Sequence, residues 1–265
     1  MQLAIWQTQG HPADPAANLA ALEARLAEVA RIGGELLLCP ELWLCGYNVA
    51  EQLAELAEPA DGPSAQRIAE LARRHGVAVC YGYAERHPEG SRPYLSVQLI
   101  DGEGRRLANY RKTHLFAAEQ ELFSPGDSLP PPVRLGAWNI GLLLGVELEY
   151  PEAVRSLVLG GVDLLLVPTA LTPEYAVVAQ SVVPARAVEN QIFVAYCDRC
   201  GEERGLEFLG GSRAVGPDGQ ALAFANGAES LLLVRLDPAL RGKLAERFPY
   251  LPGRRPALYG ALVEG

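Results

Sequence analysis

Residues 140–168 read IGLLLGVELEYPEAVRSLVLGGVDLLLVP, two apolar runs on either side of a helical segment. Ile140 to Leu144 and Leu164 to Val167 are short and continuously apolar, which is typical of strands buried on both faces. The segment between them, Pro151 to Leu159, reads as a helix. The stretch therefore predicts a strand, a helix and a second strand, and alternation of this kind indicates a layered α/β or α+β fold.

The alternation extends outward in both directions from this stretch. Leu3 to Gln7 reads as a strand, and Asp14 followed by Pro15 predicts the start of a helix that ends at Gly33-Gly34. A second helix is expected from Ser64 to His75. Further strands are predicted at residues 36–39, 77–83, 95–100, 106–111 and 192–196, a further helix through residues 186–190, and hairpin turns at residues 101–104 and 216–219.

Composition limits the class of protein. The chain has 265 residues, of which 49% are hydrophobic, and this length suits a single α/β domain without a linker. Its formal net charge of −9 opposes binding to nucleic acid or anionic membranes. Residues 1–6 enter a strand-like run without the basic region of a signal peptide, and no apolar run reaches the roughly 20 residues of a membrane span. The five cysteines are an odd number that favours a reducing cytoplasm.

Several polar residues lie directly after predicted strands, and each has a plain reading when taken alone. Glu41 would be a solvated or capping carboxylate, and Lys112 would belong to an exposed basic cluster with Glu119 as a counter-charge. Gly145 would be a strand glycine that permits close backbone approach. The CxxC spacing from Cys197 to Cys200 lacks a second ligand pair, and the histidines show no ligand spacing, so no metal site is expected.

Three segments taken together change this reading, because in order they resemble the catalytic blocks of the nitrilase superfamily of carbon–nitrogen hydrolases. They are residues 37–42 (LLCPEL), residues 110–116 (YRKTHLF) and residues 141–152 (GLLLGVELEYPE). The resemblance implies a four-layer α-β-β-α sandwich formed by one domain, residues 1–265. Residues 235–265 are expected to be a C-terminal extension at an oligomer interface.

Residue by residue, the resemblance implies a catalytic site with one member missing. Glu41 matches the family's general base and Lys112 its cation, which stabilises the oxygen of a tetrahedral intermediate. Glu119 matches a second carboxylate, because residues 119–126 reproduce the block Glu-x-x-x-Phe-x-Pro-Gly. Gly145 stands at the position of the nucleophilic cysteine, which forms a covalent acyl intermediate in the family. Val146 follows at an oxyanion or substrate position where an aromatic residue is common, and Glu147 stands where Asp is usual.

Two classes of function follow. In the first, the chain is an inactive or weakly active descendant that keeps a pocket for a small amide, nitrile or carboxylate. In the second, it is an active amidase whose nucleophile is water or another cysteine, such as Cys197. In either class we expect no cofactor, no metal, and a cytoplasmic homodimer or higher homo-oligomer, since the resemblance implies pairing of outer helices.

Overall fold

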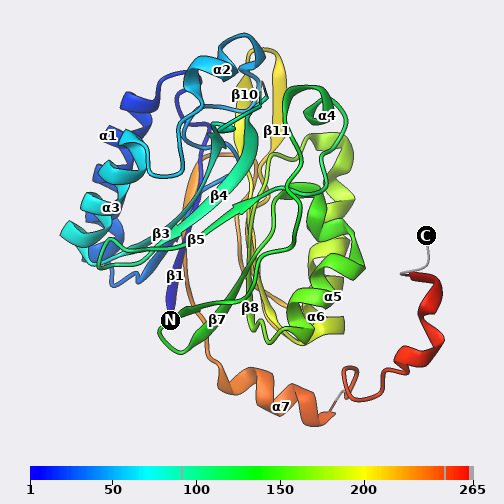
Figure 1. The fold of residues 1–265 in the computed structure, drawn as a ribbon. Helices are drawn as coiled ribbons and strands as arrows, with labels where there is room; N and C mark the ends of the chain where they lie inside the picture. The colour runs from blue at the N-terminus through cyan, green and yellow to red at the C-terminus, as the bar shows by residue number, and fades with distance from the viewer. Residues whose placement is uncertain (91, 248, 263–265) are drawn as a thin grey trace.

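The computed structural model of the protein describes residues 1–90, 92–247 and 249–262. Helices, a sheet, a second sheet and further helices follow one another across the molecule (Figure 1). The four-layer α-β-β-α sandwich predicted from the sequence is therefore confirmed.

The first sheet runs in the order β14-β1-β2-β3-β4-β5. Its strands are β14 (Ser230–Arg235), β1 (Gln2–Gln7), β2 (Leu36–Leu38), β3 (Ala78–Glu85), β4 (Tyr94–Ile100) and β5 (Arg106–Arg111). Strands β1, β2 and β3 are parallel, and the remaining pairs are antiparallel. Helices α1 (Pro15–Arg31) and α3 (Pro63–His75) pack together on the outer face of this sheet (Figure 1). The start of α1 is as the sequence predicts, because Asp14 accepts from the amide of Ala17. Helix α3 ends at His75 as predicted, because the next residue, Gly76, is left-handed.

The second sheet runs in the order β13-β12-β9-β8-β7-β6. Its strands are β13 (Ala221–Phe224), β12 (Arg213–Val215), β9 (Phe193–Cys197), β8 (Leu164–Pro168), β7 (Trp138–Leu142) and β6 (Val133–Leu135). Strands β7, β8 and β9 are parallel, so the stretch 140–168 forms a strand, a helix and a parallel strand. Helices α5 (Pro151–Leu159) and α6 (Val183–Asn190) cover the outer face, and the turn before α6, Val178–Val182, is a π-helix.

The continuous apolar runs of the sequence are explained by burial on both faces of each strand. Leu36 and Leu38 point into the core between the two sheets, whereas Leu37 belongs to the core beneath α1 and α3. Leu3 and Ile5 alternate with the intervening residues of β1 in the same way. The strands are therefore held from both sides, which gives the loops at their carboxyl ends a firm support.

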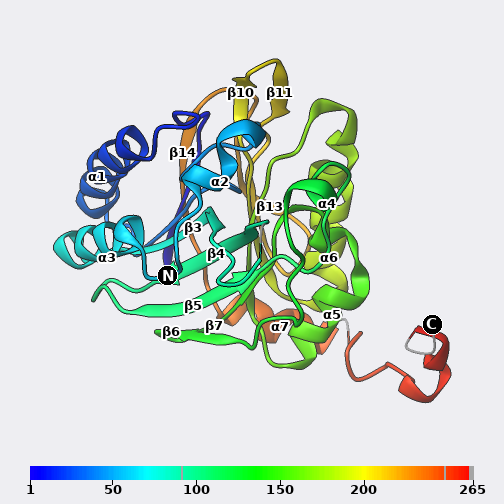
Figure 2. The ribbon, with the colours of Figure 1, turned by 45° about the horizontal axis from the view of Figure 1, so that its top comes forward.

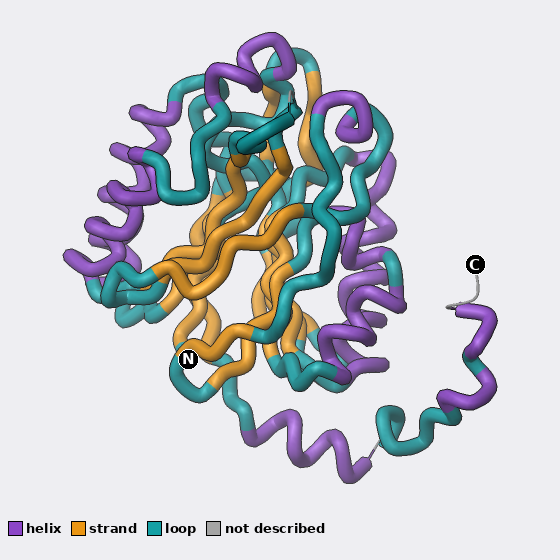
Figure 3. Tube along the Cα trace, in the orientation of Figure 1, coloured by secondary structure: helices purple, strands orange, loops and turns teal. Residues whose placement is uncertain are grey.

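Shorter elements gather at the end of the sandwich that is uppermost in Figure 1 and comes forward in Figure 2. They are α2 (Leu53–Leu56), α4 (Glu119–Leu122), and the hairpin of β10 (Cys200–Glu203) and β11 (Leu206–Leu209). None of the three is predicted from the sequence. Beyond α7 (Ala239–Arg247), residues 249–262 lie outside the four layers beside α5 (Figure 3). Within the described ranges, no helix is both long and apolar enough to cross a bilayer.

Candidate functional site

The residues singled out in the sequence converge at the end of the sandwich that carries α4. Glu41 follows β2, Lys112 follows β5, Glu119 is the first residue of α4, and Gly145 begins a 3-10 turn after β7. The Lys112 Nζ lies 2.8 Å from Glu41 Oε1 and 2.8 Å from Glu119 Oε2. All four residues are buried. Segments that are more than 100 residues apart in the chain thus form one charged cluster in an apolar surrounding.

Gly145 faces this cluster. Its φ of +45° lies in the left-handed region, which glycine adopts without a steric penalty. A Cβ built on Gly145 would lie 2.9 Å from Glu41 Oε2 and 3.3 Å from Lys112 Nζ. A sharp turn between a strand and a helical segment is also the geometry that presents a nucleophile in other hydrolases. Any side chain at position 145 would therefore point at the carboxylate and the ammonium.

The charges of the cluster shift one another. Burial raises the pKa of Glu41 from 4.5 to about 7, against the attraction of Lys112, and repulsion from Glu119 and Glu147 adds to the rise. Burial lowers the pKa of Lys112, but the two carboxylates outweigh it and hold the pKa above its usual value. Lys112 is consequently a cation at neutral pH, whereas Glu41 exchanges its proton near neutrality. A carboxylate with such a pKa is suited to general base catalysis.

Hydrogen bonds from the surrounding backbone and side chains fix Glu119. The hydroxyl of Tyr47 donates to Glu119 Oε1 at 2.7 Å, and the amide of Phe116 donates to Glu119 Oε2 at 2.9 Å. Since Lys112 donates to this carboxylate as well as to Glu41, Glu119 helps to hold the ammonium in place. Tyr47 and Phe116 both line the adjoining cavity, so this carboxylate also ties the cavity wall to the charged cluster.

Glu147 organises the two segments that meet at the site, a role that the sequence analysis did not predict. Its Oε2 accepts from the amide of Leu144 at 2.9 Å. Its Oε1 accepts from the hydroxyl of Tyr110 at 2.6 Å and from the amide and the hydroxyl of Thr113, both at 2.8 Å. Glu147 thus joins the turn at position 145 to the loop that carries Lys112. The available signal was an acidic residue between apolar neighbours, two positions after Gly145.

A buried ion pair supports the loop that carries Glu41. Arg199 Nη2 lies 2.7 Å from Glu203 Oε2, and both side chains are at most 1% exposed. Arg199 Nη1 donates to the carbonyls of Glu41 and Leu42 at 3.3 and 3.5 Å, and Glu203 Oε1 accepts from the amide of Asn48 at 2.7 Å. The pair therefore spans both ends of the loop that holds Glu41 and Tyr47. This ion pair is not predicted from the sequence, where the region stands out only for its cysteines.

The cysteines lie away from the charged cluster. Cys197 is buried, with its Sγ 3.4 Å from the carbonyl oxygens of Trp6 and of Leu38. All five cysteines are free and buried, and none lines the cavity beside Gly145. The described part of the chain contains no group of three His, Cys, Asp or Glu residues that could hold a metal ion. Cys197 is therefore not placed to replace the missing nucleophile.

A cavity of about 300 Å³ opens beside the cluster. Its floor includes Glu41, Lys112, Glu119 and Gly145, and Val146 lines it as well. The remaining wall residues are Tyr47, Phe116, Ala117, Ala118, Glu149, Thr169, Ala170, Leu171, Thr172, Glu174, Tyr175 and Leu206. This volume suits a small molecule, and a mostly apolar wall with a few converging polar groups is typical of a ligand site.

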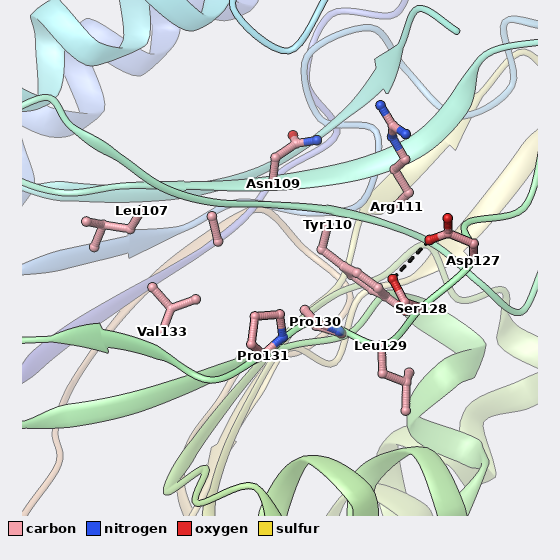
Figure 4. A pocket seen from close by; sticks show the side chains of 11 residues that line it. Leu107, Asn109, Tyr110, Arg111, Asp127, Ser128, Leu129, Pro130, Pro131 and Val133 are labelled. Carbon is pink, nitrogen blue, oxygen red and sulfur yellow. Dashed lines mark hydrogen bonds between the residues drawn. The ribbon is translucent and has the colours of Figure 1, made fainter.

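A second cavity, of about 390 Å³, lies between the edge strands β5 and β6 (Figure 4). The charged side chains that line it are Arg111 and Asp127. Arg111 is paired with Glu85 at 2.5 Å, and Asp127 accepts from the hydroxyl of Ser128 at 2.9 Å. The lining of this cavity has no buried ammonium between two buried carboxylates like the one beside Gly145. We therefore assign the candidate site to the smaller cavity.

Comparison with known proteins agrees with this arrangement. The family model described as carbon-nitrogen hydrolase matches residues 2–246. The chain belongs to the carbon–nitrogen hydrolase family. A protein of Pseudomonas protegens described as "Hydrolase in pqqF 5'region" is 44% identical over 264 residues, 99% of this chain and 92% of that protein. An (R)-stereoselective amidase from a Pseudomonas species is 36% identical over 267 residues, 100% of this chain and 95% of that enzyme.

Solved structures of this hydrolase family place the chain among amidase-like members of the nitrilase superfamily. An amidase from Nesterenkonia, in a variant with alanine in place of a cysteine, superimposes with a TM-score of 0.88 at 35% identity. The match covers 99% of this chain and 97% of that one. Another structure of the same amidase shows covalent addition of the acetamide moiety of fluoroacetamide at its active-site cysteine.

Proposed function

We propose that this carbon–nitrogen hydrolase family member binds a small amide, nitrile or carboxylate in the cavity beside Gly145 and turns it over negligibly or weakly. The observation that carries the proposal is the direction in which a side chain at position 145 would point. Its Cβ position faces Glu41 and Lys112, so a base and a cation surround a point where this chain has no side chain. The pocket has therefore kept its charges without an attacking group.

In this proposal the residues of the charged cluster still bind the ligand, but the covalent step of catalysis is lost. Lys112 attracts the carbonyl oxygen, with the turn at Val146 beside it, and Glu41 and Glu119 hold the ammonium in place. Position 145 supplies no thiol, so no covalent acyl intermediate forms and the two-step route through it is closed. Losing the nucleophile of an acyl-transfer enzyme lowers turnover by several orders of magnitude, while binding contacts remain. Binding thus survives where turnover does not.

A slow hydrolase that uses water is the second candidate. The observation that favours it is the pKa of Glu41, which is raised to about 7 and allows this carboxylate to accept a proton from water near neutral pH. Water lacks the advantage of a held nucleophile, so we expect such turnover to be weak. An active hydrolase that uses Cys197 as its nucleophile is not supported, because this thiol is buried outside the cavity.

Butyramide binding together with ammonia release tests the proposal. The choice of ligand is supported by the Nesterenkonia amidase, whose variant with alanine in place of a cysteine is in complex with butyramide. We expect calorimetry to detect butyramide binding to this chain, and a coupled assay to detect little or no ammonia. The Lys112→Met variant should lose most of the affinity. Rapid ammonia release, with typical enzymatic rates above about 1 per second, would overturn the proposal.

We also propose that the chain acts as a single domain and forms a cytoplasmic homo-oligomer. Several large apolar side chains are exposed on the C-terminal segment, including Leu258 and Leu262, beside α5. Such side chains support an interface in this region. Five free cysteines support a reducing compartment. Light scattering at micromolar concentration tests whether the chain forms a homo-oligomer, and a mass of 28.5 kDa, that of one chain, would contradict it.

A further inference from the structure

The cavity beside Gly145 carries more acid than its one lining cation can balance. Its charged lining residues are Glu41, Glu119, Glu149, Glu174 and Lys112. The ammonium of Lys112 is already bonded to Glu41 and Glu119. Among the described residues, neither Glu149 nor Glu174 forms an ion pair with this cation.

Glu149 is the more informative of the two carboxylates. It ends the 3-10 turn Gly145–Glu149, so it lies on the same turn as position 145, and it is half-buried. Among the described residues, its carboxylate has no hydrogen bond and no ion pair within 4.0 Å. The nearby Arg186 donates instead to the backbone carbonyls of Leu148 and Glu149, at 2.9 and 2.7 Å, and to the side chain of Glu189. A partly desolvated carboxylate is thus left open toward the cavity.

The electrostatics of Glu149 agree with this geometry. Burial raises the pKa of its carboxyl, and the attraction of Arg186 and of Lys112 does not cancel the rise. The cost of removing this charge from water is therefore only partly offset within the protein. A cationic group of a ligand would supply the missing attraction.

Two aromatic rings stand at the same cavity. Phe116 and Tyr175 both line it, with their ring centroids 5.6 Å apart in an edge-to-face arrangement. They remain 42% and 41% exposed, so their surfaces are available to a ligand. Aromatic faces attract organic cations, and carboxylates beside aromatic rings are suited to hold an ammonium. The aromatic pair thus offers a ring surface to the same cation that the carboxylates would attract.

We propose that this pocket takes small amides that carry an ammonium group, and that Glu149 binds that ammonium. The inference rests on the proposed function, because the amide end of the ligand is placed at Lys112 and Gly145. In that orientation the ammonium lies toward Glu149, Phe116 and Tyr175. Amides with a carboxylate at the same end are repelled by Glu149 and Glu174.

Three ligands of similar size that differ in charge test the proposal by calorimetry on the unaltered protein. They are β-alaninamide, which is cationic, butyramide, which is neutral, and succinamate, which is anionic. We expect β-alaninamide to bind about ten-fold more tightly than butyramide, as one added charge-assisted contact implies, and succinamate to bind more weakly than either. In Glu149→Gln the ratio of the affinities for β-alaninamide and butyramide should fall below about two-fold.

Glu152→Gln is the matched control, because Glu152 is an exposed residue of the same region that does not line this cavity. It should keep the ten-fold preference. Equal affinity of the unaltered protein for butyramide and β-alaninamide, or a preference that survives in Glu149→Gln, would overturn the inference and leave the proposed function standing. Failure of all three ligands to bind would overturn the proposed function itself. The comparison of ligands on the unaltered protein holds even where a variant fails to fold.

Discussion

Replacing Glu41 by glutamine should remove a dependence of stability on pH that is opposite to that of acids whose pKa is lowered by an ion pair. In the folded protein the pKa of Glu41 is raised from 4.5 to about 7. Between these values the folded chain therefore holds a proton that the unfolded chain releases. The stabilisation linked to this proton is complete below about pH 4.5 and is lost as the pH rises through about 7.

The size of the effect follows from the shift. A rise in the pKa from 4.5 to about 7 corresponds to about 3 kcal/mol in the free energy of unfolding. The glutamine of Glu41→Gln does not titrate. The free energy of unfolding of the unaltered protein, minus that of Glu41→Gln, should therefore fall by about 3 kcal/mol between about pH 4.5 and about pH 8. Carboxylates outside the cluster affect both proteins alike, so the difference between the two reports on Glu41 and the groups coupled to it.

Urea denaturation of both proteins at the two pH values measures this difference. Glu121→Gln serves as the control, because Glu121 is an exposed acid on the same short helix, α4. Its difference from the unaltered protein should vary by less than about 0.5 kcal/mol over the same range. The reasoning is refuted if the Glu41→Gln difference is independent of pH, or if the unaltered protein gains stability relative to this variant as the pH rises.

Three further substitutions test how the site is held together. Lys112→Met should lower the free energy of unfolding by about 3–5 kcal/mol, because two buried carboxylates lose their cation; urea denaturation with no measurable loss would contradict it. Arg199→Lys should lower the free energy of unfolding by a similar amount and weaken butyramide binding. The reason is that lysine cannot reach both Glu203 and the carbonyl groups to which Arg199 donates. Unchanged affinity would show that the loop needs no such support. Glu147→Gln should cost about 1–3 kcal/mol, because an amide oxygen cannot accept from all the donors that now face the carboxylate, and stability equal to that of the unaltered protein would contradict this assignment.

The order of strands and helices could be predicted because local chemistry and tertiary packing agree. The runs at 36–38 and 164–168 are apolar throughout, and the structure buries both faces of each strand. The hairpin of β10 and β11 could not be predicted in this way. Its first strand reads Cys-Gly-Glu-Glu, which has little strand preference, and contacts from Arg199 and Glu203 to a distant loop support it.

The candidate site likewise has residues that the sequence predicts and residues that it does not. Glu41, Lys112, Glu119 and Gly145 could be named because each lies in a segment that resembles a catalytic block of the family. The support from Glu147 and Arg199 depends on contacts between segments that are far apart in the chain, such as Arg199 with the carbonyl of Glu41. No local pattern separates such a buried charge from an exposed one. Only the structure shows which charges hold the loops of the site.

Formation of a covalent acyl adduct tests most directly the claim that the pocket has kept its charges and lacks an attacking group. The unaltered protein and Gly145→Cys are incubated with an activated butyrate ester, and the intact mass of each is recorded. The new thiol would point at Glu41 and Lys112, although Glu41 must move slightly because the Cβ lies 2.9 Å from its Oε2. The account predicts one butyryl adduct on Gly145→Cys and none on the unaltered protein, whose five cysteines are buried. An adduct on the unaltered protein, or a folded Gly145→Cys that stays unmodified, would contradict it.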